Sequence, residues 1–340
     1  MDQRKLSRRI VLLAVLATGC SKPSEPAPSG SAPQQAAEAK AAASTAEAVT
    51  VRIGYQKIGS PFLLKERAES LTKALEQSNA KVEWIEFQAG PPILEAMRGG
   101  AVDVGYVGET PPVFAQAGGV PFVYVARDPS APKSEAILVP KNSKITKVSE
   151  LKGKRVAVNR GSNVHYLLHK ALEAEKLALT DVDVVFLAPA DARSAFDTGK
   201  VDAWVIWDPF QAAAEIAGAR VLRDGEGLVQ NQFFYVARRE FAEKNAELVR
   251  VVLKEFETLS QWAGAHPEEA STLLAKSSGI AYDALLLAEK RHLYGLKSFN
   301  GEAVKQQQEI ADAFSKIQVI PKEIKIADNV LPQPLYGDAR

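Results

Sequence analysis

The sequence predicts an α/β protein of two lobes, each built on a mostly parallel sheet. Apolar runs of strand length alternate with helical segments from residue 51 to 218, which is typical of parallel sheets covered on both faces. The stretch 95–112, EAMRGGAVDVGYVGETPP, has the same pattern as 195–210, AFDTGKVDAWVIWDPF, about a hundred residues later. The chain of 340 residues is long enough for two lobes of ordinary size.

The first copy of this α/β unit begins at Val51. It contains predicted strands over 51–55, 81–87, 102–107 and 122–126, and predicted helices over 63–78, 93–100 and 112–119. A second copy restarts at Lys154, with predicted strands over 154–159, 182–188 and 201–206 and predicted helices over 162–175, 192–199 and 207–218. Because Val102-Asp103 aligns with Val201-Asp202 and 51–56 with 155–160, we interpret the two units as an internal repeat of domain size.

Two further strand-like runs, 134–143 and 232–241, lie at the ends of the copies and are predicted to connect the lobes. Residues 240–330 are mostly helical in pattern, and we expect them to return to the first lobe. The predicted organisation is a first lobe of 49–134 plus 238–330, a second lobe of 135–237 and an irregular tail of 331–340.

The N-terminus is typical of an exported protein. Residues 1–9 are basic and 10–17 are apolar, a run too short to span a bilayer. The single cysteine, Cys20, follows small residues in ATGC. This stretch resembles the lipobox of bacterial lipoproteins, which implies that 1–20 is a signal peptide with a lipobox and that Cys20 is lipidated. Ordinary cleavage, with Cys20 as an incidental thiol, is the alternative, and general or twin-arginine export are both open. Residues 21–48 are rich in Ala, Pro and Ser and predict a disordered tether.

Charge excludes one class of partner. The net charge of +1 offers no basic excess for a phosphate backbone, so nucleic acid is not expected. No apolar run after the signal peptide approaches 18 residues, so contact with a membrane is expected through a lipid anchor only.

In open α/β sheets, ligands bind beyond the carboxyl ends of the strands, where loops lead into helices. That rule predicts a cleft between the lobes lined by Gln56, Lys57, Glu109, Thr110, Arg160, Gly161, Ser162, Asn163, Asp191, Trp207 and Asp208. The helix start at 161–163 favours an anion, although Ser162 or Asn163 could instead merely cap the helix. Trp207 ends its strand and is predicted to form an apolar wall, whereas Trp204 in mid-strand is expected in the core.

Catalytic signatures are missing from the sequence. It contains no phosphate-binding loop, no nucleophile elbow and no dinucleotide fingerprint. His165 and His169 are four residues apart but read HYLLH, without the glutamate of a zinc protease, so a surface or capping role is expected. We therefore predict a binding protein rather than an enzyme, with neither metal nor cofactor.

Several segments together resemble the aliphatic sulfonate-binding proteins of ABC importers, within the sulfonate, nitrate and taurine family. They are 54–57 (GYQK), 87–96, 105–126, 134–140, 161–165, 186–196 and 201–215, and the resemblance covers about 51–320. It implies a type II periplasmic-binding-protein fold that closes over its ligand like a hinge. Glu109 stands where Asp is commoner in the family, and the loop after Lys57 is shortened, so the size of the pocket is expected to differ.

The resemblance implies a monomeric solute-binding protein that captures an organosulfonate for sulfur acquisition and delivers it to the transmembrane subunits of an ABC permease. We expect it in the periplasm or at the cell surface, tethered through Cys20. The alternatives are a binding protein for nitrate, taurine or another small anion or organic ligand, a sensory binding protein, and an enzyme on the same fold.

Overall fold

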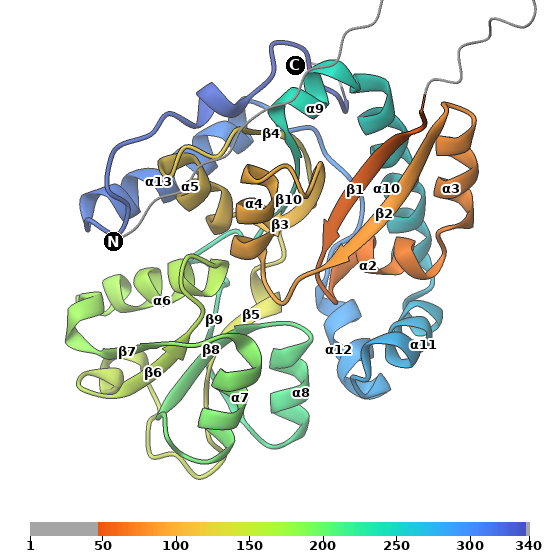
Figure 1. The fold of residues 1–340 in the computed structure, drawn as a ribbon. Coiled ribbons are helices and arrows are strands. Elements are labelled where there is room, and N and C mark those ends of the chain that lie inside the picture. Colours follow the sequence, from red (N-terminus) through yellow and green to blue (C-terminus); the bar gives the residue numbers. More distant parts are fainter. Residues whose placement is uncertain (1–46, 338–340) are drawn as a thin grey trace, which may run out of the picture. The chain divides into compact units, whose positions relative to one another are not determined.

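The computed structural model describes residues 47–337 (Figure 1). The predicted signal peptide, the lipidation site Cys20 and nearly all of the predicted tether therefore lie outside the described residues. The end of the predicted tail, 338–340, lies outside them as well, whereas 331–337 form no helix or strand. Within the described part of the chain, no helix is both long enough and apolar enough to cross a membrane.

The first lobe contains a five-stranded sheet of order β2-β1-β3-β10-β4. Its strands are β1 (Val49–Tyr55), β2 (Ala80–Glu86), β3 (Val104–Gly108), β4 (Phe122–Arg127) and β10 (Phe233–Arg238). Strand β1 runs parallel to β2 and β3, whereas β10 runs antiparallel to β3 and β4. Four strands thus share one direction, and the predicted mostly parallel sheet is confirmed.

The second lobe repeats this topology with a sheet of order β7-β6-β8-β5-β9. Its strands are β5 (Glu135–Val139), β6 (Arg155–Val158), β7 (Asp183–Phe186), β8 (Ala203–Trp207) and β9 (Arg220–Asp224). Strand β6 is parallel to β7 and β8, and β5 is antiparallel to β8 and β9. The internal repeat is confirmed, because each strand of one sheet has a counterpart in the same place in the other.

The repeated Val-Asp pair has the same structural task in both copies. The carboxylate of Asp103 accepts the backbone N–H of Arg52 at 3.1 Å, and that of Asp202 accepts the N–H of Arg155 at 2.8 Å. Each aspartate therefore ties the strand that follows it to the neighbouring parallel strand, at Arg52 in the middle of β1 and at Arg155 at the start of β6. Asp103 is fully buried and also pairs with Arg238 at 2.8 Å, which joins β10 to this arrangement.

The two connecting runs are strands inside the sheets. Strand β5 lies between β8 and β9, and β10 lies between β3 and β4. Since β10 belongs to the first sheet, the return crossing lies before Phe233 and not at the predicted boundary of 238. The chain crosses between the lobes in two segments, 128–134 and 225–232. They lie side by side and are joined by backbone hydrogen bonds, with Asp128 N donating to Phe233 O at 2.8 Å and Gly225 N to Pro132 O at 3.0 Å.

Helices cover both sheets (Figure 1). In the two repeats they are α2 (Gly59–Glu66), α3 (Glu69–Glu76), α4 (Gly90–Arg98), α5 (Thr110–Ala117), α6 (Asn163–Ala174), α7 (Pro189–Asp197) and α8 (Phe210–Ile216). One helix was predicted over 63–78, and the structure divides it between α2 and α3. Strand β9 was not predicted, because its apolar residues Val221 and Leu222 stand between arginines.

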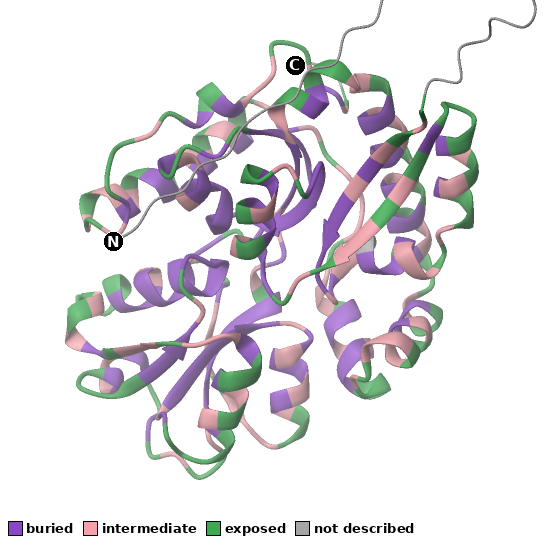
Figure 2. Cartoon of the chain, viewed as in Figure 1, coloured by how far each residue is buried: buried purple, intermediate pink, exposed green. Residues whose placement is uncertain are grey.

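The C-terminal part is helical, as predicted. It contains α9 (Arg239–Lys244), α10 (Ala246–Ala265), α11 (Pro267–Ser278), α12 (Tyr282–Arg291) and α13 (Gly301–Lys316). Helix α10 packs on α2 and α3, but α12 packs on α8 of the second lobe, where Ala284 and Ala288 meet Ala212. The central strands are buried throughout, whereas edge strands β2 and β7 carry exposed residues (Figure 2).

Candidate ligand-binding site

Three adjoining cavities lie where the loops after the strands of the two lobes meet, and Trp207 lines all three. Cavity A is lined by Gln56, Gly90, Gly108, Pro111, Ser162, Asn163, Trp207 and Phe233. Cavity B is lined by Lys57, Ile58, Gly59, Tyr106, Ser134, Trp207, Asp208, Pro209, Phe233, Leu274, Leu285, Ala288, Glu289 and His292. Cavity C is lined by Gln56, Lys57, Ile58, Glu86, Phe87, Gln88, Pro189, Ala190, Trp207 and Phe210.

Cavity A is formed by the N-terminal ends of three helices. Helix α4 begins at Gly90, α5 presents Pro111 in its first turn, and α6 begins at Asn163 after its N-cap residue Ser162. These ends carry partial positive charge, and no ionisable side chain is among the residues that line the cavity. The arrangement suits an anion that is held by these partial charges and needs no proton transfer.

Two glycines allow the chain segments around cavity A to approach one another. A Cβ atom on Gly108 would lie 2.1 Å from the side-chain oxygen of Asn163. A Cβ atom on Gly90 would lie 2.9 Å from the Pro111 ring. Gly90 was not among the predicted site residues, because a glycine in the turn before α4 has no polar side chain to mark it.

Asn163 links the lobes at the edge of cavity A. Its side-chain oxygen accepts the backbone N–H of Thr110 at 3.2 Å, and its Nδ2 donates to the side-chain oxygen of Asn231 at 2.8 Å. The N–H of Thr110 is thus bonded to Asn163 and is not free for a ligand. The Thr110 hydroxyl oxygen is buried and has no hydrogen-bond partner among the described residues.

The loop before α6 contributes less than predicted. Gly161, at φ +70°, donates its N–H to Nδ1 of His165 at 3.3 Å and packs on Phe114. Ser162 lines cavity A, and its hydroxyl donates to Asn159 O at 2.7 Å. Arg160 is exposed, with its guanidinium 5.3 Å from the ring centre of Phe186, and lines none of the three cavities.

The two acids among the predicted site residues that are buried, Glu109 and Asp208, accept hydrogen bonds from backbone N–H groups. The carboxylate of Glu109 accepts from Asn231 N at 3.2 Å and Gln232 N at 3.0 Å. The carboxylate of Asp208 accepts from Ala212 N at 3.0 Å and pairs with Arg291 at 3.3 Å. Burial raises the pKa of Glu109 to about 7, and burial, opposed by Arg291, raises the pKa of Asp208 to about 7.

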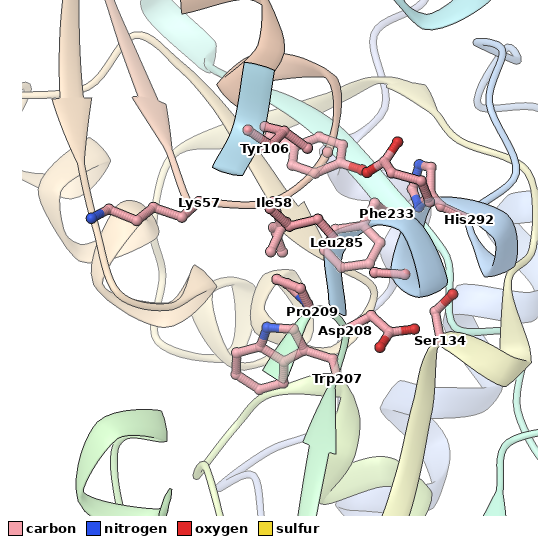
Figure 3. A pocket seen from close by; sticks show the side chains of 14 residues that line it. Lys57, Ile58, Tyr106, Ser134, Trp207, Asp208, Pro209, Phe233, Leu285 and His292 are labelled. Carbon is pink, nitrogen blue, oxygen red and sulfur yellow. The ribbon is translucent and has the colours of Figure 1, made fainter. Parts of the chain in front are cut away.

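The other predicted residues divide between the cavities and the surface. Gln56 is buried, lines cavities A and C, and donates to Tyr106 O at 3.2 Å. Lys57 lines cavities B and C, but its ammonium points away from cavity B toward Glu86, 3.4 Å away (Figure 3). Asp191 is exposed in the first turn of α7 and lines none of the three cavities.

The histidines of α6 are not on the surface, so that part of the prediction is wrong. His165 is 2% exposed and His169 is 7% exposed, because both pack on Phe314 of α13. Burial, with the nearby Arg160, lowers the pKa of His165 to about 4, so the ring is neutral and accepts the Gly161 N–H. This bond is a capping role, which the sequence analysis allowed.

Sequence reasoning missed most of cavity B, which encloses about 470 Å³. Leu274 of α11 and Leu285 of α12 reach it from helices distant in sequence, and His292 follows α12 (Figure 3). His292 Nε2 lies 3.6 Å from a carboxylate oxygen of Asp128, and that oxygen also accepts the Tyr106 hydroxyl at 2.5 Å. No spacing in the sequence connects these residues, since the fold alone brings them together.

Two repeated α/β lobes that face each other across an anion-suited cavity define a two-lobed solute-binding protein. Residues 49–278 match the family model described as the substrate binding domain of an ABC-type glycine betaine transport system. The chain belongs to this family of substrate-binding proteins of ABC transporters.

Relatives and solved structures agree. A protein of Escherichia coli (strain K12), named as a candidate aliphatic sulfonates-binding protein, is 42% identical over 84% of this chain and 90% of its own length. The alkanesulfonate-binding protein SsuA from Xanthomonas axonopodis pv. citri, bound to MOPS, superposes with a TM-score of 0.80 at 35% identity, covering 84% of this chain and 99% of that one. The periplasmic aliphatic sulphonate binding protein SsuA from Escherichia coli gives a TM-score of 0.75 at 41% identity, covering 83% and 97%. The predicted family and two-lobed fold are confirmed.

Proposed function

We propose that this protein captures aliphatic sulfonates and presents them to the permease of an ABC importer. The observation that carries the proposal is cavity A, where the N-terminal ends of α4, α5 and α6 converge without an ionisable side chain. A sulfonate is ionised at every physiological pH, so neutral donors and helix termini suffice to bind it. The relatives named for sulfonates support this choice of ligand.

The carbon chain of the ligand would leave cavity A along apolar surface. Trp207 and Phe233 line both cavity A and cavity B, so they form a common wall between the two. Aromatic side chains of this kind provide large apolar contact area. The predicted binding residues Gln56, Ser162, Asn163 and Trp207 are retained in this proposal, whereas Arg160 and Asp191 are left out of it.

Calorimetric titration of the purified protein tests the proposal. We expect one site per chain for methanesulfonate and butanesulfonate, with nitrate and sulfate bound at least about tenfold more weakly than butanesulfonate. The reason is that only the alkyl chain can reach the Trp207 wall, where each buried methylene contributes about 0.8 kcal/mol. Tight binding of sulfate or nitrate with no sulfonate binding would contradict the proposal, as would turnover of a sulfonate to a new product.

We further propose that the protein acts in the periplasm or at the cell surface, tethered to a membrane by lipid on Cys20. The support is the sequence alone, where the basic and apolar segments of 1–17 precede Cys20. Membrane fractions should retain the protein, and Cys20→Ser should release it or block its processing. Wild-type protein recovered wholly in the soluble periplasmic fraction would contradict the anchor.

A gene for a permease beside the gene for this protein would favour a role in import over a role in sensing.

A further inference from the structure

Cavity B is placed to receive the far end of a ligand whose anionic group occupies cavity A. The cavities share Trp207 and Phe233, and Ile58, Leu274 and Leu285 give cavity B apolar walls. Besides Tyr106, four ionisable side chains also line it: Lys57, Asp208, Glu289 and His292. The ammonium of Lys57 points away (Figure 3), so the other three determine the charge of the cavity.

Two of these three groups have partners of opposite charge. Asp208 pairs with Arg291 at 3.3 Å, and Arg291 also binds Glu215 at 2.9 Å. His292 lies 3.6 Å from Asp128, whose side chain is 1% exposed. When His292 is protonated, its charge is therefore balanced by a buried carboxylate that does not itself line the cavity.

Glu289, in contrast, has no ion-pair partner among the described residues. The residue is 8% exposed and accepts a hydrogen bond from the Tyr294 hydroxyl. Among the described residues, no lysine, arginine or histidine nitrogen lies within the 4.0 Å that defines an ion pair with it. A buried carboxyl without a directly paired cation is unfavourable when ionised. Burial raises the pKa of Glu289, and the more distant charge of His292 opposes that rise only in part.

The charges around cavity B also favour a positively charged group on the ligand. Four carboxyl groups (Asp128, Asp208, Glu215 and Glu289) lie at or behind this end of the cavity, together with one guanidinium (Arg291) and one imidazole (His292). The end of cavity B is thus short of positive charge, while cavity A has the positive ends of three helices. A ligand that matches both cavities carries a negative group at one end and a positive group at the other.

We propose that Glu289 is a specificity-determining residue that selects sulfonates with a cationic amine on their carbon chain. This inference rests on the proposed function, since it requires the sulfonate in cavity A. The amine would supply the buried carboxylate with a charge-assisted hydrogen bond, and the aliphatic chain between the two groups would pass Trp207 and Phe233.

Calorimetry with three ligands of equal length tests the amine directly. These are propane-1-sulfonate, 3-hydroxypropane-1-sulfonate and 3-aminopropane-1-sulfonate, with the four-carbon homologues as a second set. We expect the amino compound to bind at least about tenfold more tightly than the other two in one of the sets. Equal affinity of the amino and alkyl compounds in both sets would overturn the inference, and so would a hydroxyl compound that matches the amine.

Glu289→Gln then assigns the effect to one residue. In this variant, the ratio of the dissociation constants of the propyl and aminopropyl compounds should fall to about twofold or less. Glu268→Gln is the control, because Glu268 is exposed in the first turn of α11, and it should keep the wild-type ratio. A wild-type ratio in Glu289→Gln overturns the assignment. If this variant does not fold, the wild-type panel still decides for or against the amine. Absence of binding for all three ligands would instead overturn the proposed function itself.

Discussion

The side-chain oxygen of Asn163 accepts the backbone N–H of Thr110 at 3.2 Å, and both residues are buried. Thr110 begins α5 of the first lobe and Asn163 begins α6 of the second, so this bond joins two helix N-termini across the cleft. Asn163 also bonds to Asn231 in the return crossing. One side chain thus connects both lobes, a crossing segment and cavity A.

Replacing this residue with an acid tests whether cavity A binds an anion. Asn163→Asp keeps the shape and the acceptor for Thr110 N–H, adds a negative charge to the cavity and gives up the N–H donor to Asn231. We expect at least about a hundredfold loss in sulfonate affinity by calorimetry, because like charges brought together cost several kcal/mol. Asn300→Asp is a matched control, since Asn300 caps α13 and aspartate caps equally well. Affinity within a few-fold of wild type in Asn163→Asp would exclude cavity A as the anion site.

Trp207 should determine how affinity depends on chain length. Trp207→Ala removes the wall shared by all three cavities, so longer alkanesulfonates should lose more affinity than methanesulfonate. The difference should grow by up to about 0.8 kcal/mol, about fourfold in Kd, for each methylene that contacts the ring. Trp204→Phe is the control, because Trp204 packs in the core against Phe196. Equal losses at every chain length in Trp207→Ala would show that the ligand does not touch Trp207.

The buried Glu109 should make stability depend on pH. Its pKa is raised from 4.5 to about 7 by burial, so the folded state binds a proton that the unfolded state releases. The stability from this proton is complete below about pH 4.5 and is lost as the pH rises through 7, by about 3 kcal/mol in total. Urea unfolding between pH 5 and 8 should show a steeper decline for wild type than for Glu109→Gln. Parallel curves would mean that Glu109 does not titrate in this range.

Ligand binding should compact the molecule. A ligand that contacts both lobes binds the closed arrangement more tightly than an open one and therefore shifts the population toward it. Small-angle scattering at saturating butanesulfonate should give a smaller radius of gyration than the free protein. An unchanged radius, with binding shown by calorimetry, would mean that the lobes do not close on the ligand.

Much of the fold could be predicted because its signals are local. Strands β1, β3, β6 and β8 are short apolar runs, and the repeated Asp103 and Asp202 mark the same turn in both copies. Strand β9 could not be predicted in this way, since it has few apolar residues and is held by pairing with β5.

The site was less predictable because it depends on tertiary contacts. The rule that ligands bind beyond strand ends selected Gln56, Ser162, Asn163 and Trp207, which line cavity A, and their contact with a ligand stays a prediction. The same rule selected Arg160 and Asp191, whose loops point their side chains to the surface. It could not find Glu289 and His292, because helix α12 reaches the cleft only through its packing on α8.

A crystal structure of the complex with butanesulfonate, with the ligand sulfur located by anomalous scattering, tests the central claim most directly. The chain has only two methionines and one cysteine, and Met97 is the one sulfur-containing residue within 47–337, so the ligand sulfur would stand out. We predict that it lies in cavity A, between Gly90, Gly108 and Asn163, with the alkyl chain against Trp207 and Phe233. A ligand sulfur in cavity B, or outside the cleft between the lobes, would contradict the account.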